Sequence, residues 1–197
     1  MLETPLNQKR KQLWLLAGGN GAGKSTFYQQ FLKSRGLAFV NADLLAQQLD
    51  PQQPEKVSYE AAILVGKLRQ QLLENGENFC FETVFSHPSK IDFMAQAKAL
   101  GYEVTLIYIH LVNTELNQAR VSQRVASGGH DVPADKIISR IPRTMKNIRD
   151  ALPLSDIARF YDNSSLHRPF QSIAEIRRGN LQTFCDPLPQ WAREVLR

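Results

Sequence analysis

Residues 18–25 constrain the fold of this chain more strongly than any other segment. Their sequence, Gly-Gly-Asn-Gly-Ala-Gly-Lys-Ser, fits the pattern G-x-x-x-x-G-K-[ST], in which glycines let successive backbone N–H groups turn toward phosphate oxygens. An apolar run at 12–17 precedes the pattern, as expected of a strand buried on both faces, and a helical segment follows at 24–34. The segment therefore predicts a phosphate-binding loop between a strand and a helix.

Each part of this loop has an expected role in binding a nucleoside triphosphate. Lys24 is expected to reach the β- and γ-phosphates as a catalytic residue, and Ser25 to supply a hydroxyl to Mg²⁺. A helix that begins near Gly23 adds its positive end to the site. We therefore expect ATP and Mg²⁺ as cofactors, although the motif does not separate ATP from GTP. The expected nucleotide-binding residues are Gly18, Gly19, Asn20, Gly21, Ala22, Gly23, Lys24, Ser25 and Thr26.

Short apolar segments alternate with longer helical segments along the chain. Strands are expected at 12–17, 37–41, 79–82, 104–111 and 159–162. Helices are expected at 24–34, 54–75, 87–100, 114–127, 133–150 and 189–197. This alternation is typical of βαβ units and predicts an α/β fold of the P-loop NTPase type, with a mostly parallel five-stranded sheet and helices on both faces. The 197 residues are expected to form a single domain, residues 1–197.

Glycine and proline positions add two finer expectations. Residues 170–177 and 181–184 are expected to form a C-terminal β-hairpin around Gly179-Asn180. Pro142 lies in the interior of the helix expected at 133–150, where a proline kinks or breaks a helix.

Composition and charge narrow the class of protein. No apolar run approaches the length of a membrane span, and residues 1–12 lack the apolar core of a signal peptide, so we expect no membrane contact and a cytoplasmic location. The net charge is +5, and the basic residues are concentrated between Arg120 and Arg149. Such a patch suits nucleic acid, a set of clamps over a triphosphate, or solvent-exposed helix faces. Aromatic residues are not interleaved with the basic ones, which disfavours a groove for single-stranded nucleic acid.

Asp43 is the candidate catalytic base. It follows the second expected strand, and ligands of parallel α/β sheets bind at the carboxyl ends of the strands. A carboxylate there can orient a substrate hydroxyl and accept its proton during phosphoryl transfer. Asp is also a favoured helix N-cap, and Leu44 begins a helical pattern. The two roles are compatible, so both remain open.

Glu82 and Thr83 end the third expected strand. An acidic residue at this place commonly organises the Mg²⁺ of a phosphate-loop protein, but it could equally bind the hydroxyls of a substrate. An ordinary acidic residue at the end of a strand is the remaining interpretation. Glu82 is therefore a candidate for both metal and substrate binding, and Thr83 is a candidate for substrate binding.

Residues 114–150 are expected to form a helical lid that carries arginines. Arg120 and Arg124 are spaced to share one helix face, as are Arg140 and Arg143 on the next helix. Residues 128–133 form a glycine-containing elbow between the two helices. Arginine suits the stabilisation of charge on a transferring phosphoryl group, so we expect Arg120 and Arg124 ahead of Arg140 as catalytic clamps. Solvent-facing, salt-bridged helices are the alternative.

With these residues in place, the chain resembles the zeta toxin family of small-molecule kinases. The resemblance spans roughly 12–163 and is carried by residues 17–26, by Asn41-Ala42-Asp43, by Glu82-Thr83, and by residues 129–133 with the helix that follows them. It implies ATP-dependent phosphorylation of a nucleotide-activated amino sugar, UDP-N-acetylglucosamine in the best-known members. It also implies a small antitoxin protein as a partner.

The resemblance assigns roles to residues of this chain. Asp43 matches the family's base, Lys24 its phosphate-loop lysine and Glu82 a substrate-binding acid. One or two lid arginines match its γ-phosphate clamps, and His130 and Arg140 are further candidates for the second clamp and for substrate contact. Val84 stands where the typical family member has a second threonine.

Three functions remain open from the residues alone. The first is a Mg²⁺-dependent kinase for a small molecule, with Asp43 as base. The second is a kinase or binder directed at nucleic acid, which a steep salt dependence of nucleic-acid affinity would favour. The third is a nucleotide-gated ATPase switch with a protein partner, which would not need an acceptor carboxylate at Asp43.

Overall fold

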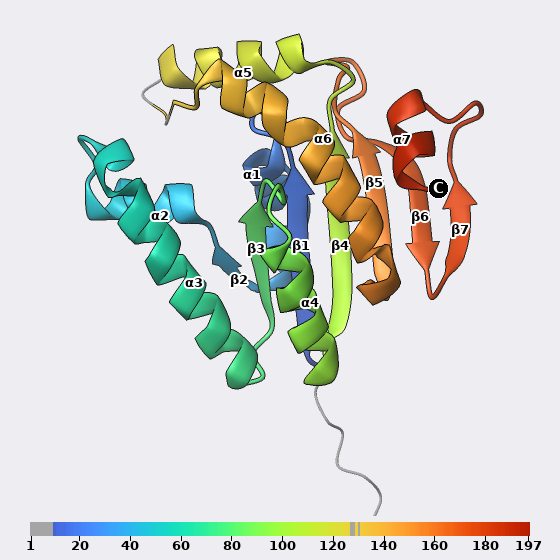
Figure 1. The fold of residues 1–197 in the computed structure, drawn as a ribbon, viewed down its shortest axis with the longest axis horizontal. Helices are drawn as coiled ribbons and strands as arrows, with labels where there is room; N and C mark the ends of the chain where they lie inside the picture. The colour runs from blue at the N-terminus through green and yellow to red at the C-terminus, as the bar shows by residue number, and fades with distance from the viewer. Residues whose placement is uncertain (1–9, 127–128, 130) are drawn as a thin grey trace, which may run out of the picture.

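A computed structural model of the protein describes residues 10–126, 129 and 131–197. His130 lies outside the described residues. Within them, the strands form one mixed sheet in the order β2-β3-β1-β4-β5-β6-β7 (Figure 1). The first five strands in this order pair in parallel, and β6 and β7 add to them as an antiparallel hairpin. The strands are β1 (Gln12–Gly18), β2 (Ala38–Val40), β3 (Phe79–Thr83), β4 (Glu103–His110), β5 (Ile157–Asp162), β6 (Gln171–Arg177) and β7 (Asn180–Thr183).

The predicted five-stranded parallel sheet and C-terminal hairpin are thus confirmed. The turn of the hairpin lies one residue earlier than predicted, at Arg178-Gly179. Both of these residues have positive φ, 50° and 80°, which is the backbone conformation of the two-residue turns that match strand twist.

β1 shows why the sheet is covered on both faces. Leu13 and Leu15 point into a core that they share with α3, α4 and α6, whereas Trp14 and Leu16 point into a second core. Phe27 closes that second core on the opposite face, where α1 lies behind the sheet in Figure 1. The continuous apolar run at 12–17 therefore forms a strand that is buried on both faces.

The helices follow the predicted order with four differences in detail, the first being a helix at Ala42–Leu49 that is not among those expected. The first predicted helix is α1 (Lys24–Phe27) continued by a π-helical turn at Tyr28–Leu32 and a 3₁₀ turn at Lys33–Arg35. Pro142 lies inside α6 without ending it, since loss of one i to i−4 hydrogen bond is tolerated in a helix of 18 residues. A 3₁₀ turn at Pro54–Val57 forms the start of the predicted segment 54–75. The other helices are α2 (Ala42–Leu49), α3 (Ser58–Glu74), α4 (Ser89–Ala99), α5 (Thr114–Ala126), α6 (Ala134–Ala151) and α7 (Gln190–Val195).

α5 lies across the carboxyl ends of the central strands, and α6 starts beside it and runs down over one face of the sheet (Figure 1). A small apolar cluster of Val121, Val132 and Ile137 packs the two helices together beside the elbow. A hydrophobic contact therefore joins α5 and α6. It lies at the edge of the sheet from which the phosphate loop emerges. Across the described residues, no helix has the length and apolar character needed to cross a bilayer.

Candidate active site

The phosphate loop joins β1 to α1 and is closely packed against its surroundings. A Cβ at Gly18 would lie 2.3 Å from the carbonyl oxygen of Ile109 on the neighbouring strand β4, so only glycine fits there. Gly23 has φ of 93°, and a Cβ on it would lie 2.5 Å from Nδ2 of Asn163. The spacing of glycines that defined the motif is thus required both by backbone conformation and by close approach.

Side chains from distant elements hold the loop in shape. Nδ2 of Asn117 in α5 donates to the carbonyl oxygen of Asn20 at 2.6 Å. Nδ2 of Asn163, just after β5, donates to the carbonyl oxygen of Ala22 at 2.9 Å, and its Oδ1 accepts from the N–H of Phe170. Neither Asn117 nor Asn163 is among the predicted site residues. Their role is apparent only from the structure, because a single asparagine in a helix or after a strand belongs to no sequence motif.

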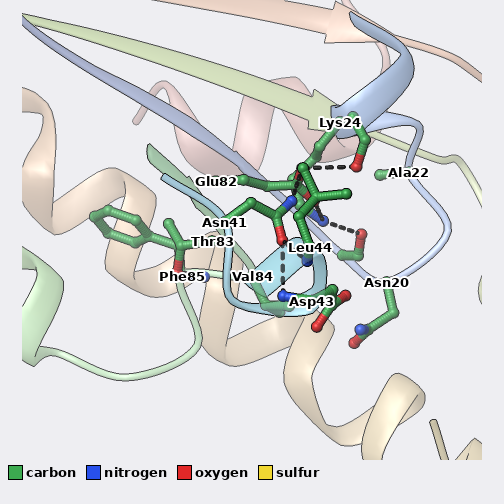
Figure 2. A network of polar contacts seen from close by, with 12 residues as sticks. Asn20, Ala22, Lys24, Asn41, Asp43, Leu44, Glu82, Thr83, Val84 and Phe85 are labelled. Carbon is green, nitrogen blue, oxygen red and sulfur yellow. Dashed lines mark hydrogen bonds and ion pairs between the residues drawn. The ribbon is translucent and has the colours of Figure 1, made fainter. Parts of the chain in front are cut away.

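Glu82 is the centre of the polar network at the end of β3 (Figure 2). Its Oε2 accepts hydrogen bonds from Oγ of Ser25 and from Nδ2 of Asn41, each at 2.7 Å. Its Oε1 lies 3.5 Å from Nζ of Lys24, which also donates to the carbonyl oxygen of Gly19 at 3.0 Å. Two predicted site residues at the start of α1, Lys24 and Ser25, therefore converge on the carboxylate of a third, Glu82.

The donor set at this point suits Mg²⁺. A hydroxyl and a carboxylate are hard oxygen ligands, and Mg²⁺ commonly takes one or two protein oxygens and completes its shell with water and substrate phosphates. Ser25 and Glu82 are already adjacent, at the mouth of the phosphate loop. Among the described residues, no group of three or more His, Cys, Asp or Glu side chains could hold a metal by itself.

Asp43 lies in the first turn of α2 and is exposed toward the same cleft. The helix cap that the sequence suggested for Asp43 belongs to Asn41, whose Oδ1 accepts from the N–H groups of Asp43 and Leu44 at 2.8 and 3.1 Å. The suggestion was wrong by two residues, because the backbone is extended at Asn41 and helical from Ala42 onward. The carboxylate of Asp43 takes no part in capping and lies 4.0 Å from a guanidinium nitrogen of Arg124.

The lid arginines fall into two groups. Arg120, Arg124 and Arg140 line the cleft, and Arg140 reaches Oδ1 of Asn20 in the phosphate loop at 3.2 Å. Arg120 donates to the carbonyl oxygen of Asn163 at 2.8 Å, and burial lowers the pKa of its guanidinium. Arg143 instead folds back on its own helix, where its Nε donates to the carbonyl oxygen of Ser139. Three of the four arginines singled out in the sequence therefore line the cleft, and only Arg140 contacts the phosphate loop among the contacts described.

The segment after β3 forms the floor of the cleft beyond Glu82. Oγ1 of Thr83 accepts from the N–H of Phe85 at 3.1 Å, which ties this hydroxyl to the backbone. Phe85 is buried and has φ of 65°, a conformation that few non-glycine residues adopt. Thr144 and Asn147 of α6 donate to the carbonyl oxygens of Val84 and Phe85. The lid helix α6 therefore holds the turn in this unusual shape.

The cleft that joins these parts has a volume of about 870 Å³. Ligand sites in proteins commonly measure about 300–1,000 Å³, so this one lies in the upper part of that range. Its lining includes Phe170, which packs with Phe27 of α1 in the second core, and Arg69 and Lys90, which come from α3 and α4 on the opposite face of the sheet. Glu82 and Asp43 line the same cleft.

Comparisons with known proteins agree with this architecture. The family described as Zeta toxin matches residues 2–167, so the match ends before β6. An uncharacterized protein of Haemophilus influenzae is 33% identical over 133 residues, which are 64% of this chain and 94% of that protein.

Solved structures share the fold at low identity. A chain of the PezAT chromosomal toxin–antitoxin system of Streptococcus pneumoniae matches with a TM-score of 0.65 and 19% identity over 99% of this chain and 86% of that one. A chain of the AvrRxo1-ORF1:AvrRxo1-ORF2 complex with sulphate ions matches with a TM-score of 0.72 and 17% identity over 90% of this chain. The corresponding complex with ATP gives a TM-score of 0.70 at 19% identity.

This chain spans 62% and 61% of the two AvrRxo1 chains, respectively. Such likeness establishes a P-loop kinase-type fold. The family match covers most of the sequence, including the phosphate loop, Asp43, Glu82 and the lid. The chain therefore belongs to the zeta toxin family.

Proposed function

We propose that this protein is an ATP- and Mg²⁺-dependent phosphotransferase that moves the γ-phosphate of ATP to a hydroxyl of a small molecule. One observation carries the proposal. The carboxylate of Asp43, which takes no part in the helix cap, lines the same cleft as the phosphate loop and lies 4.0 Å from the lid residue Arg124. An ATPase switch has no need of an acceptor-side carboxylate in this position, whereas a kinase does.

The triphosphate would bind along the phosphate loop. Backbone N–H groups of the loop and the start of α1 would surround its oxygens. Nζ of Lys24 would exchange its hydrogen bond to Gly19 for the β- and γ-phosphates. Arg140, which already reaches Asn20, would approach the same phosphates from the lid.

Ser25 and Glu82 are the residues that would hold Mg²⁺, which would neutralise charge on the phosphates when bound. Asn41 donates to the same carboxylate and so fixes its orientation. Glu82 therefore has a proposed metal role here in addition to the substrate role that the resemblance implies. Thr83, beside it, would face the acceptor.

Asp43 would act on the acceptor. Its carboxylate would accept the proton of the acceptor hydroxyl as the new oxygen–phosphorus bond forms and the bond to the bridging oxygen of ADP breaks. Arg124 would leave Asp43 for the transferring phosphoryl group, where its guanidinium stabilises the developing charge. Arg120, anchored on Asn163, would support it from the nucleotide side.

The acceptor that the family resemblance favours is UDP-N-acetylglucosamine or a related sugar nucleotide. The volume of the cleft, in the upper part of the usual range, supports an acceptor of this size. A partner protein of the antitoxin type is a further proposal. It is supported by the structural likeness to a chain of the PezAT toxin–antitoxin system.

Turnover of Mg²⁺–ATP should be measured with the purified protein, alone and with a panel of UDP-sugars, and the product identified by mass spectrometry. A phosphorylated acceptor with matching ADP release is the expected result. Oligonucleotides belong in the same panel, since phosphorylation of RNA or DNA would replace the small-molecule proposal. ADP release without any phosphorylated acceptor would indicate an ATPase instead.

A further inference from the structure

Two cations line the cleft from the face of the sheet opposite α1. Arg69 comes from α3 and Lys90 from the first turn of α4, two helices that cover the same face of the sheet (Figure 1). The turn that follows β3 separates them from Glu82. Neither residue belongs to the phosphate loop or to the lid, so the proposed handling of ATP leaves both without a role.

The Arg69 guanidinium is held in a fixed place. It lies 4.9 Å from the ring centre of Phe81 and 5.8 Å from that of Phe93. Its Nε is buried and has no hydrogen-bond partner in the described part of the chain. A guanidinium offers five N–H donors, and burying them unpaired costs free energy unless something else accepts them. The stacked rings thus preorganise a cation whose donors are unused.

Lys90 adds a second positive charge beside it. Burial lowers the pKa of Lys90, and repulsion by the charge of Arg69 lowers it further. Burial also lowers the pKa of Arg69. Two like charges close enough to repel each other destabilise the empty protein, and a bound anion removes that repulsion.

No acidic side chain neutralises the pair. Within residues 10–126, 129 and 131–197, neither Arg69 nor Lys90 forms an ion pair, and Lys90 only donates to the neighbouring hydroxyl of Ser89. The acids that line the same cleft are already engaged, Glu82 by Lys24 and Asp43 by Arg124. This positive part of the cleft is therefore open to a ligand.

We propose that Arg69 and Lys90 form a second anion-binding site, separate from the phosphate loop, which holds a phosphate or carboxylate group of the acceptor. This inference rests on the proposed function in so far as the ligand is the acceptor. The anionic group binds between α3 and α4, and the rest of the acceptor extends past Thr83 toward Asp43. The site thus selects charged acceptors over their uncharged counterparts and orients the hydroxyl that reacts.

Inorganic phosphate is the first probe, in a chemical-shift titration of protein saturated with Mg²⁺ and a non-hydrolysable ATP analogue, so that the phosphate loop is occupied. Wild-type protein should bind one further phosphate. Arg69→Gln and Lys90→Gln should each weaken that binding by about 10- to 100-fold, the value of a hydrogen bond to a charged group. Lys67→Gln, an exposed residue of α3, is the matched control and should bind as wild type does.

If Arg69→Gln fails to fold, Lys90→Gln still tests the site, because Lys90 is not stacked on the rings of Phe81 and Phe93. Equal phosphate affinity in wild type and Lys90→Gln would overturn the site, as would absence of a second phosphate in wild type. The titration needs no turnover, so an inactive protein would remove the proposed kinase function and leave the anion site standing.

Kinetics then distinguish an acceptor's own anionic group from a free phosphate that acts as an effector. Phosphate should compete with the acceptor, and Lys90→Gln should raise the acceptor KM by about 10- to 100-fold while the ATP KM and kcat stay near wild type. With an acceptor that lacks the charged group, wild type and Lys90→Gln should have the same acceptor KM. Phosphate that changes turnover without competing, or a loss confined to kcat, would contradict the assignment.

Discussion

Oγ of Ser25 donates a 2.7 Å hydrogen bond to Oε2 of Glu82, 57 residues later in the chain. The contact exists because β1 and β3 are parallel neighbours with Leu16 opposite Glu82, so the phosphate loop and the end of β3 emerge at one edge of the sheet. It brings the hydroxyl and the carboxylate that suit Mg²⁺ into contact before any ligand is bound.

Glu82→Gln should raise the Mg²⁺ concentration needed for half-maximal turnover. The amide can still accept from Ser25, but it lacks the negative charge that binds a divalent cation. We expect a shift of about 10- to 100-fold in a Mg²⁺ titration of ADP release, a range typical of altered metal environments. Glu60→Gln, on the exposed surface of α3, should leave the titration unchanged. An identical Mg²⁺ requirement in both variants would remove Glu82 from the metal site.

Lys24→Ala should weaken nucleotide binding and abolish nucleotide-dependent activity while the fold persists. Nζ of Lys24 contacts only Gly19 and Glu82 among the described residues, both within the site, so its loss leaves the hydrophobic core intact. Calorimetry should show ATP affinity reduced by about 100-fold, consistent with loss of charge-assisted hydrogen bonds. Lys33→Ala, in the exposed turn after α1, is the control. Normal ATP turnover by Lys24→Ala would refute the role of the phosphate loop.

Arg124→Ala should lower kcat far more than it lowers ATP affinity. We expect a decrease in kcat of about 100-fold, because the guanidinium is proposed to act on charge that develops in the transition state. Arg143→Ala provides a matched control in the same lid, since Arg143 turns back onto Ser139. If the two variants had equal kcat, the clamp would have to be assigned to Arg120 or Arg140.

Protein stability should fall below neutral pH because of His110. Burial is the main cause that lowers the pKa of His110 to about 4, against the opposing charges of Asp162 and Glu194. The unfolded chain therefore takes up the proton first, and stability present above pH 6.5 is lost as the pH falls toward 4. Urea unfolding should show a decrease of about 2 kcal/mol between pH 7 and pH 5. His110→Gln should show a smaller decrease, and an equal one would assign the loss to other groups.

The features that the sequence predicts correctly are those set by residues close together in the chain. The apolar run at 12–17, the glycines of the loop and the strand–helix alternation each depend on neighbouring residues, so the parallel sheet, the hairpin and the helices α5 and α6 were predictable. Asn41, Asn163 and Arg69 were not predicted as site residues. Asn41 and Asn163 act through Glu82 and Ala22, which lie 41 and 141 residues away in the chain. Arg69 stacks on rings from β3 and α4, and no local pattern encodes that contact.

The sequence suggested Asp43 as a helix cap, but the cap of α2 is Asn41. Both Asn41 and Asp43 are favoured capping residues, and each is followed by helix-forming residues. The extended backbone of Asn41 decides between them, because only its side chain can turn back to the N–H groups of the first turn. Asp43 is thereby left exposed to the cleft for another role.

The most direct test of the account is the kcat of phosphoryl transfer by Asp43→Asn, measured beside ATP affinity. Asparagine keeps the shape of the side chain but cannot accept the proton of the acceptor hydroxyl. Asp50→Asn, at the far end of α2, is the control, since its side chain only caps the turn at Gln52 and Gln53. We predict a loss in kcat of about 10²- to 10⁴-fold for Asp43→Asn with ATP affinity unchanged. Wild-type turnover by Asp43→Asn would contradict the proposed kinase mechanism.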